Sequence, residues 1–213
     1  MADYFDDLLT AILDADRDLN PSRLSELSDP TRVHLKVFRE AWFETPAPRR
    51  REISQHLYEL ARENIELLFE RINRVLLEDP DPVVRKQAID NLWEAEGKDL
   101  AITLARMANE DPDLEVRRRA AEALSRFIYL SEMEKIPADV RDHIEATLLQ
   151  MLEKSSSRNL QRQALESLGY SSHIDLREKI HASYESGNEE DLRSSLVAMG
   201  RSADPGWREK IEA

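Results

Sequence analysis

Histidine is the side chain of this chain best suited to bind a metal or to transfer a proton near neutral pH. No two histidines have the His-Glu-x-x-His spacing that places two imidazoles on one helix face, and there is no cysteine to complete a site. The pattern favours exposed or helix-capping histidines, and we expect no bound metal ion. The five histidines are His34, His56, His143, His173 and His181.

Two segments carry a serine close behind a glycine, as in the turn that holds a nucleophilic serine. Gly169-Tyr170-Ser171 and Gly200-Arg201-Ser202 lack the second glycine of that motif, and no predicted strand precedes either segment. Each follows a predicted helix. We therefore interpret Gly169 and Gly200 as helix C-caps in the left-handed conformation.

An acidic run, Asp14-Ala15-Asp16-Arg17-Asp18, resembles the start of a calcium-binding loop. The sixth position of such a loop requires glycine and the twelfth requires a bidentate glutamate, but this chain has Leu19 and Ser25 there. No glycine-rich loop that could bind phosphate occurs in the sequence. The sequence therefore predicts no catalytic residue and no cofactor.

The composition indicates the fold class that must position these side chains. The chain has 213 residues, 41% of them hydrophobic, and a formal net charge of −13. It has five glycines, the first at Gly97. Sandwiches and barrels need many turns with positive φ, so an all-helical chain is expected. The acidic charge disfavours nucleic acid and anionic membranes as partners, and the acidic N-terminus with no long apolar run predicts a cytoplasmic protein.

Apolar residues recur at spacings of three and four along almost the whole chain, and proline or short polar clusters interrupt the pattern. This periodicity predicts consecutive antiparallel helices joined by short loops. The predicted helices cover residues 3–14, 30–43, 48–63, 66–78, 82–95, 98–109, 114–129, 138–153, 157–169, 174–186, 188–200 and 205–212.

The sequence repeats itself. Residues 79–92 align with residues 111–124 at an offset of 32, and residues 160–168 align with the second copy at an offset of 44. We interpret residues 129–140 as an insertion that accounts for the longer offset. Gly169 and Gly200 then align at an offset of 31. Such periodic similarity is typical of a solenoid, in which helix pairs stack to bury their apolar faces.

The pattern Asp-x-x-x-x-Val-Arg-x-x-Ala-x-x-x-Leu occurs at Asp79–Leu92 and at Asp111–Leu124. It resembles the second-helix signature of HEAT repeats, and its short period is similar to that of bacterial HEAT-like repeats, including the phycobilin-lyase type. The resemblance implies an all-α, right-handed superhelix of antiparallel helix pairs. We expect one continuous solenoid over residues 65–213 and a divergent helical cap at residues 1–64.

In HEAT repeats, the corresponding Asp and Arg link adjacent repeats in a ladder. The resemblance implies this structural role for Asp79, Arg85, Asp111 and Arg117. Both aspartates also precede a predicted helix, where a carboxylate can accept hydrogen bonds from free N–H groups. In the next two helix pairs both positions change together, as a paired ladder predicts; they become Ser155 with Gln161 and then Ser186 with Leu192.

An apolar stripe with a spacing of four faces the partner helix in each signature. In the first signature it consists of Val84, Ala88 and Leu92. We expect three aromatic side chains to complete or cap this core, namely Trp93, Phe127 and Trp207.

One surface position is basic in four consecutive repeats of an acidic chain. The residues are Lys86, Arg118, Arg162 and Arg193, and they are expected on or beside the concave side. Glu122 and Glu166 lie four positions after two of them, and Asp90 lies four after Lys86. One interpretation is a partner-binding surface that uses Lys86, Arg118, Glu122, Arg162, Glu166 and Arg193. The alternative is a set of ion pairs at spacing i, i+4 on a solvated face.

The expected function is a non-catalytic scaffold that binds a protein partner through its concave face. The family resemblance leaves two alternatives: an enzyme of the chromophore-lyase type and a DNA-binding HEAT-like solenoid. The last segment, residues 207–212, reads as the first helix of a further pair. Its apolar side, Trp207 and Ile211, would pack back on the preceding helix or leave an open end that favours self-association.

Overall fold

The computed structural model describes residues 2–212, and across that range the chain forms helices and no strands. The predicted all-α class is therefore confirmed. The chain divides into two compact units, Met1–Ala95 and Glu96–Ala213. Each predicted helix corresponds to an observed one, although several ends differ.

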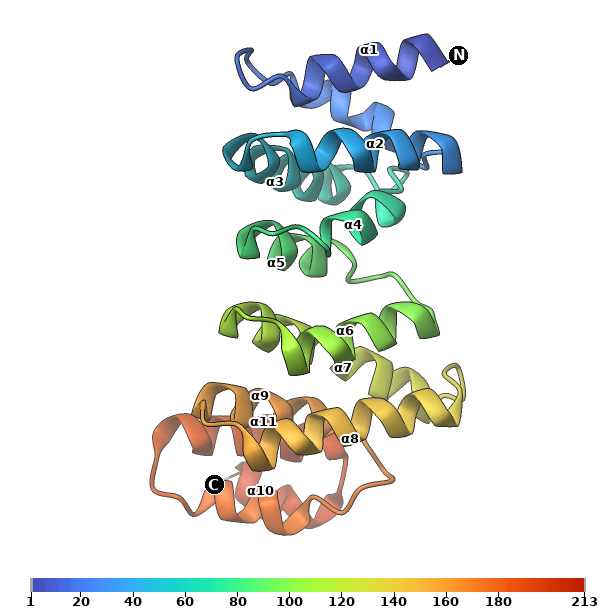
Figure 1. Cartoon of the computed structure of the whole chain (residues 1–213). Helices are drawn as coiled ribbons and strands as arrows, with labels where there is room; N and C mark the ends of the chain where they lie inside the picture. Colours follow the sequence, from blue (N-terminus) through green and yellow to red (C-terminus); the bar gives the residue numbers. More distant parts are fainter. Residues whose placement is uncertain (1, 213) are drawn as a thin grey trace. The chain divides into compact units, whose positions relative to one another are not determined.

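Over the described residues 2–95, the first unit contains five α-helices and a short 3₁₀ helix (Figure 1). In sequence order these are α1 (Ala2–Leu13), η1 (Pro21–Leu27), α2 (Arg32–Glu44), α3 (Ala47–Glu63), α4 (Glu70–Leu76) and α5 (Pro82–Asn91). The 3₁₀ helix was not predicted. Asn20 caps it by accepting a hydrogen bond from the Ser22 N–H at 3.2 Å, and Pro21 supplies a preset φ at its first position.

The second unit consists of antiparallel helix pairs in two layers. Its elements are α6 (Lys98–Glu110), α7 (Leu114–Glu132), α8 (Ala138–Lys154), α9 (Arg158–Leu168), α10 (Arg177–Tyr184), α11 (Glu189–Ser202), η2 (Pro205–Trp207) and α12 (Arg208–Glu212). The second helices of the pairs, α7, α9 and α11, pack side by side, and α6 packs against α8 in the other layer. In Figure 1, α8 runs across the front of this unit with α9 behind it.

The second helices begin at caps that differ from the expected ones. Asp81, not Asp79, caps α5 by accepting from the Val83 N–H at 2.9 Å. Asp113, not Asp111, caps α7 in the same way. The earlier aspartate of each Asp-Pro-Asp accepts instead from the N–H two residues on, at 2.8 Å and 2.9 Å, because proline between them turns the chain before the helix starts.

The apolar stripe forms the core as expected, and Val84, Ala88 and Phe127 are buried. Trp207 is buried as well. The expectation for Trp93 is wrong, because its side chain is 65% exposed. The helix α5 ends at Asn91, so Trp93 lies in the turn after the helix and leaves the buried stripe.

The glycine interpretation is also wrong in its conformation. Gly169 has φ −53°, a right-handed value, and Gly200 lies inside α11, whose C-cap is Ala203 with φ 51°. A Cβ on Gly169 would lie 3.0 Å from the backbone Cα and O of Ala198. Gly169 is therefore required by the close approach of α9 to α11, not by a left-handed turn.

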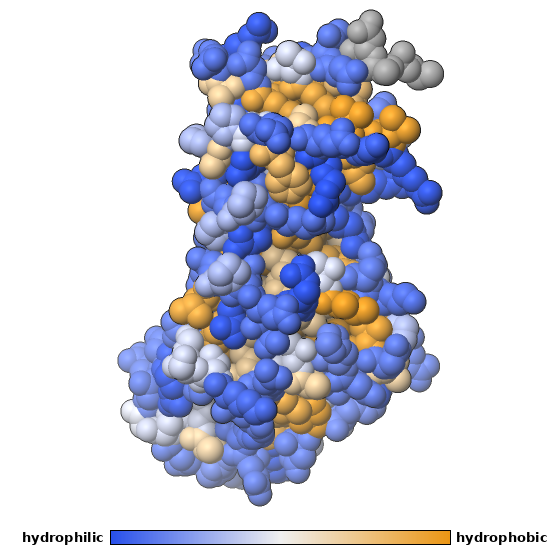
Figure 2. Space-filling model, viewed as in Figure 1, coloured by the Kyte–Doolittle hydropathy of each residue, from blue (hydrophilic) through white to orange (hydrophobic). Residues whose placement is uncertain are grey.

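The surface of the molecule is mostly hydrophilic in the view of Figure 2, with apolar patches that include one at the level of α1 and α2. Among residues 2–212, no helix combines the length and apolarity needed to cross a bilayer.

Candidate functional site

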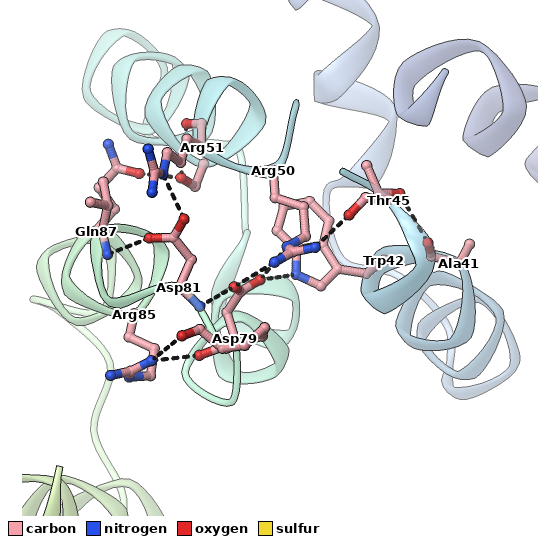
Figure 3. Close-up of polar contacts among 12 residues, drawn as sticks. Ala41, Trp42, Thr45, Arg50, Arg51, Asp79, Asp81, Arg85 and Gln87 are labelled. Atoms are coloured by element: carbon pink, nitrogen blue, oxygen red, sulfur yellow. Dashed lines mark hydrogen bonds and ion pairs between the residues drawn. The ribbon is translucent and has the colours of Figure 1, made fainter. Parts of the chain in front are cut away.

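A buried polar network fixes the geometry of the first unit (Figure 3). The carboxylate of Asp79 accepts hydrogen bonds from Trp42 Nε1 at 2.7 Å, from Arg50 Nε at 2.8 Å and from the Asp81 N–H at 2.8 Å. Arg50 Nη2 completes a bidentate contact at 3.2 Å. This carboxylate therefore ties α2 and α3 to the turn that precedes α5.

Arg85 contacts the backbone of the loop before its own helix. Its Nη1 donates to the backbone oxygens of Asp79 and Pro80, at 2.8 Å and 3.0 Å. Arg50 donates in the same way to the oxygen of Thr45, before its own helix. Sequence comparison missed Arg50, because Glu44-Thr45-Pro46 lacks the Asp-Pro-Asp of the later loops.

In the second unit the corresponding residues again donate to backbone oxygens, at the end of the first helix of each pair. Arg117 Nε donates to the Ala108 oxygen at 3.1 Å, and Gln161 Nε2 donates to the Ser155 oxygen at 2.8 Å. Gln161 stands where Arg85 and Arg117 stand in the earlier pairs. The neutral amide of Gln161 therefore keeps a hydrogen bond to the preceding loop, although the positive charge of the arginine is absent.

Asp191, at the start of α11, is a second buried carboxylate. It pairs with Arg158 and with Arg162, whose Nε lies 2.6 Å from its Oδ1. Burial alone would raise the pKa of Asp191, but the hydrogen bond from Arg162 and the charges of both arginines outweigh it and lower the pKa. Arg162 therefore binds the start of α11. It also donates a 3.0 Å hydrogen bond to Oδ1 of Asn188, the N-cap of that helix.

The structure brings some of the predicted surface residues together and leaves others apart. Arg118 contacts Glu122 at 3.2 Å, the expected i, i+4 ion pair, and also Glu115 at 2.6 Å. Arg162 pairs with Asp191, and no pair with Glu166 forms in its place. Glu166 accepts a hydrogen bond from Ser194, so its carboxylate is occupied as well.

Arg193 and Lys86 differ from the other basic residues of this position. Arg193 on α11 is exposed, and Lys86 on α5 is half-buried. Neither side chain makes a hydrogen bond or ion pair with any residue in the part of the chain that the structure describes. Arg193 therefore offers its charge to solvent on the same unit as Arg118 and Arg162.

After three of the four basic residues, the next residue in the chain contacts the preceding second helix. This contact was not predicted, because the position is polar but changes type from one repeat to the next. The three contacts are Gln87 Nε2 to Gln55 at 2.8 Å, Arg118 Nη1 to Gln163 at 3.2 Å, and Ser194 Oγ to Glu166 at 2.6 Å.

An aromatic cluster lies at the opposite end of the second helices. The rings of Tyr129 and Tyr170 meet edge to face with centroids 5.6 Å apart, and the Arg201 guanidinium lies 5.0 Å over the Tyr170 ring. Arg201 is held there by a 2.7 Å hydrogen bond to the Glu166 backbone oxygen. Sequence analysis missed this cluster, although Tyr170 and Arg201 share one repeat position at the offset of 31.

We call the surface of α7, α9 and α11 the second-helix face. It carries basic side chains toward the N-terminal ends of the helices and the aromatic cluster toward their C-terminal ends. Tyrosine and arginine are enriched at protein interfaces, where they supply apolar area and directed hydrogen bonds. The residues that define this face are Arg118, Arg162, Arg193, Tyr129, Tyr170 and Arg201.

Residues 2–212 contain no group of three or more His, Asp or Glu side chains placed to hold a metal ion. His173 lies 3.6 Å from Glu132 and 3.2 Å from Arg141, so it belongs to a surface polar cluster.

Comparison with known families and proteins gives one match. Residues 71–138 match the family model for HEAT repeats. No curated protein and no solved structure matches the chain.

Proposed function

Because residues 71–138 are HEAT repeats, we propose that the chain is a non-catalytic scaffold that binds a protein partner through the concave side expected for its second helices. HEAT repeats commonly act as protein-interaction scaffolds. The observation that carries the proposal is the cluster of Tyr129, Tyr170 and Arg201, which joins α7, the turn after α9, and α11. An aromatic cluster with a fixed arginine is the type of anchor on which interface free energy concentrates.

The charge of the second-helix face favours an acidic segment of the partner. Glu122 and Glu166 are already hydrogen-bonded within the face, to Arg118 and Ser194. Arg193 is exposed and keeps its full donor capacity in a chain whose net charge is −13. A partner with carboxylates would pair with Arg193 while its apolar side chains cover the aromatic cluster.

The experiment is quantitative affinity capture from the native host followed by mass spectrometry. The bait is the wild-type chain, a Tyr129→Ala variant or an Arg193→Glu variant. The control is Ile102→Ala, which removes an exposed apolar side chain from α6, outside the second-helix face. We expect both face variants to reduce recovery of one partner about tenfold, as loss of an interface anchor does.

Equal recovery by all four baits would contradict the proposed face. A coloured product on co-expression with a bilin would support the chromophore-lyase alternative in place of the scaffold. Salt-sensitive DNA binding would support the DNA-binding alternative.

A further inference from the structure

A cleft with a mixed apolar and polar lining lies on the first unit, where the loop between α3 and α4 meets the end of α5. Its volume is about 340 Å³, near the lower end of the range for ligand pockets. Three large apolar residues line it and are strongly exposed: Ile65 at 89%, Trp93 at 65% and Leu68 at 58%. A group of exposed large apolar side chains is uncommon on a soluble domain and marks an interaction site.

The loop that presents these side chains is fixed by hydrogen bonds. The Leu68 N–H donates to Ser28 Oγ at 2.9 Å, and the Leu68 oxygen accepts from the Asp29 N–H at 2.9 Å. The Glu66 N–H donates to Asn64 Oδ1 at 2.9 Å. Ile65 and Leu68 are therefore held in place before a partner arrives, which lowers the entropy cost of binding.

Exposed carboxylates lie in and next to the cleft. Glu94 lines it, and Glu63 and Glu66 are sequence neighbours of lining residues. The three carboxylates form no ion pair or hydrogen bond with any residue between positions 2 and 212. Arg62 is the one guanidinium among the lining residues, and it donates to Tyr58 at 2.9 Å and lies 5.4 Å over the Tyr58 ring. Because the carboxylates outnumber this cation, a ligand of the cleft meets negative potential.

We propose that this cleft docks a basic segment of a partner protein that inserts a tryptophan side chain. The indole covers Ile65, Leu68 and Trp93. Lysine or arginine residues on either side of the tryptophan pair with Glu63, Glu66 and Glu94. The site lies wholly on the first unit, so it is independent of the second-helix face and of the function proposed for that face.

The test uses three synthetic peptides and isothermal titration calorimetry on the full chain. The first is lysine-rich with one central tryptophan, the second replaces the tryptophan with alanine, and the third replaces every lysine with glutamate. We expect saturable, salt-sensitive binding of the first, about tenfold weaker binding of the second through loss of the apolar anchor, and no binding of the third.

Variants of the chain assign the effect to the cleft. Ile65→Ser should weaken the first peptide, and since Ile65 is almost fully exposed this change leaves the fold intact. Val33→Ser, at an exposed apolar position on α2, is the matched control and should bind normally.

The proposal is overturned if the tryptophan–lysine peptide fails to bind or if the glutamate peptide binds as well. Equal weakening by Ile65→Ser and Val33→Ser also overturns it, since binding would then be unspecific.

Discussion

The guanidinium of Arg50 and the carboxylate of Asp79 form a bidentate ion pair in which the side chains are 7% and 0% exposed. The two residues are 29 positions apart and join α3 to the turn before α5. Trp42 donates to the same carboxylate, so three segments of the first unit share one buried anion. Removing either ionic partner would leave a buried charge without compensation.

We expect Arg50→Ala and Asp79→Ala each to lower the free energy of unfolding by about 3 kcal/mol, the usual loss when one member of a buried pair is removed. The double variant should be little worse than either single one, because the shared contact is lost once. Urea denaturation followed by circular dichroism gives these values. The exposed pair of Arg39 with Glu78 is the control, and Arg39→Ala should cost less than about 1 kcal/mol. Additive losses at Arg50 and Asp79 would contradict the pairing.

Gly169→Ala and Gly200→Ala should have opposite effects. A Cβ at Gly169 would lie 3.0 Å from Ala198, so we expect a loss of about 1–3 kcal/mol from overpacking. A Cβ at Gly200 meets no atom within 4 Å, and alanine there should stabilise α11 by about 0.5–1 kcal/mol. Thermal melts of the two variants measure the difference. A Gly169→Ala chain as stable as wild type would mean that α9 and α11 can separate freely.

The stability of the second unit should fall in acid because of Asp191. Its pKa is lowered in the folded chain, so it contributes stability above its unfolded pKa of about 3.9 and loses that contribution as the pH falls through the folded value. We expect wild type to lose more stability than Asp191→Asn between about pH 5 and pH 2. Melting temperatures across this range provide the measurement, and parallel curves for the two proteins would refute the assignment.

Trp207→Ala should destabilise the C-terminal end by about 3 kcal/mol, because it empties a buried site. The Arg177 guanidinium lies 5.1 Å over this ring, and that contact would be lost too. Ile211→Ala removes a half-exposed side chain four residues later and should change stability by less than about 0.5 kcal/mol. Urea midpoints distinguish the two, and equal effects would show that Trp207 carries no core role.

Sequence periodicity was sufficient for the helices and for the buried stripe, because a 3.6-residue period follows directly from the chain. It failed at ends that depend on tertiary contacts. The start of α4 was expected at residue 66 but lies at Glu70, because Asn64 and Ser28 hold residues 66–68 in a loop. Trp93 was assigned to the core because the apolar pattern continues past Asn91, whereas the helix α5 ends there.

The candidate surface was less predictable than the fold. Repeat alignment placed Arg118 and Arg162 at one position, and both lie in contact with the next second helix. A charged side chain faces solvent or contacts a neighbouring helix depending on the distance between repeats. The spacing of residues within one repeat does not determine that distance. Arg193 is exposed at the same repeat position.

The hydrogen bonds between neighbouring second helices limit how helix pairs can be duplicated or deleted. Gln87, Gln163 and Ser194 each match a different side chain on the helix before, namely Gln55, Arg118 and Glu166. Each of these junctions therefore has its own pair of donor and acceptor side chains. A duplicated or deleted helix pair would bring mismatched donors and acceptors together. The helix pairs are similar in shape but not interchangeable, so growth or loss of repeats requires compensating substitutions at the new junction.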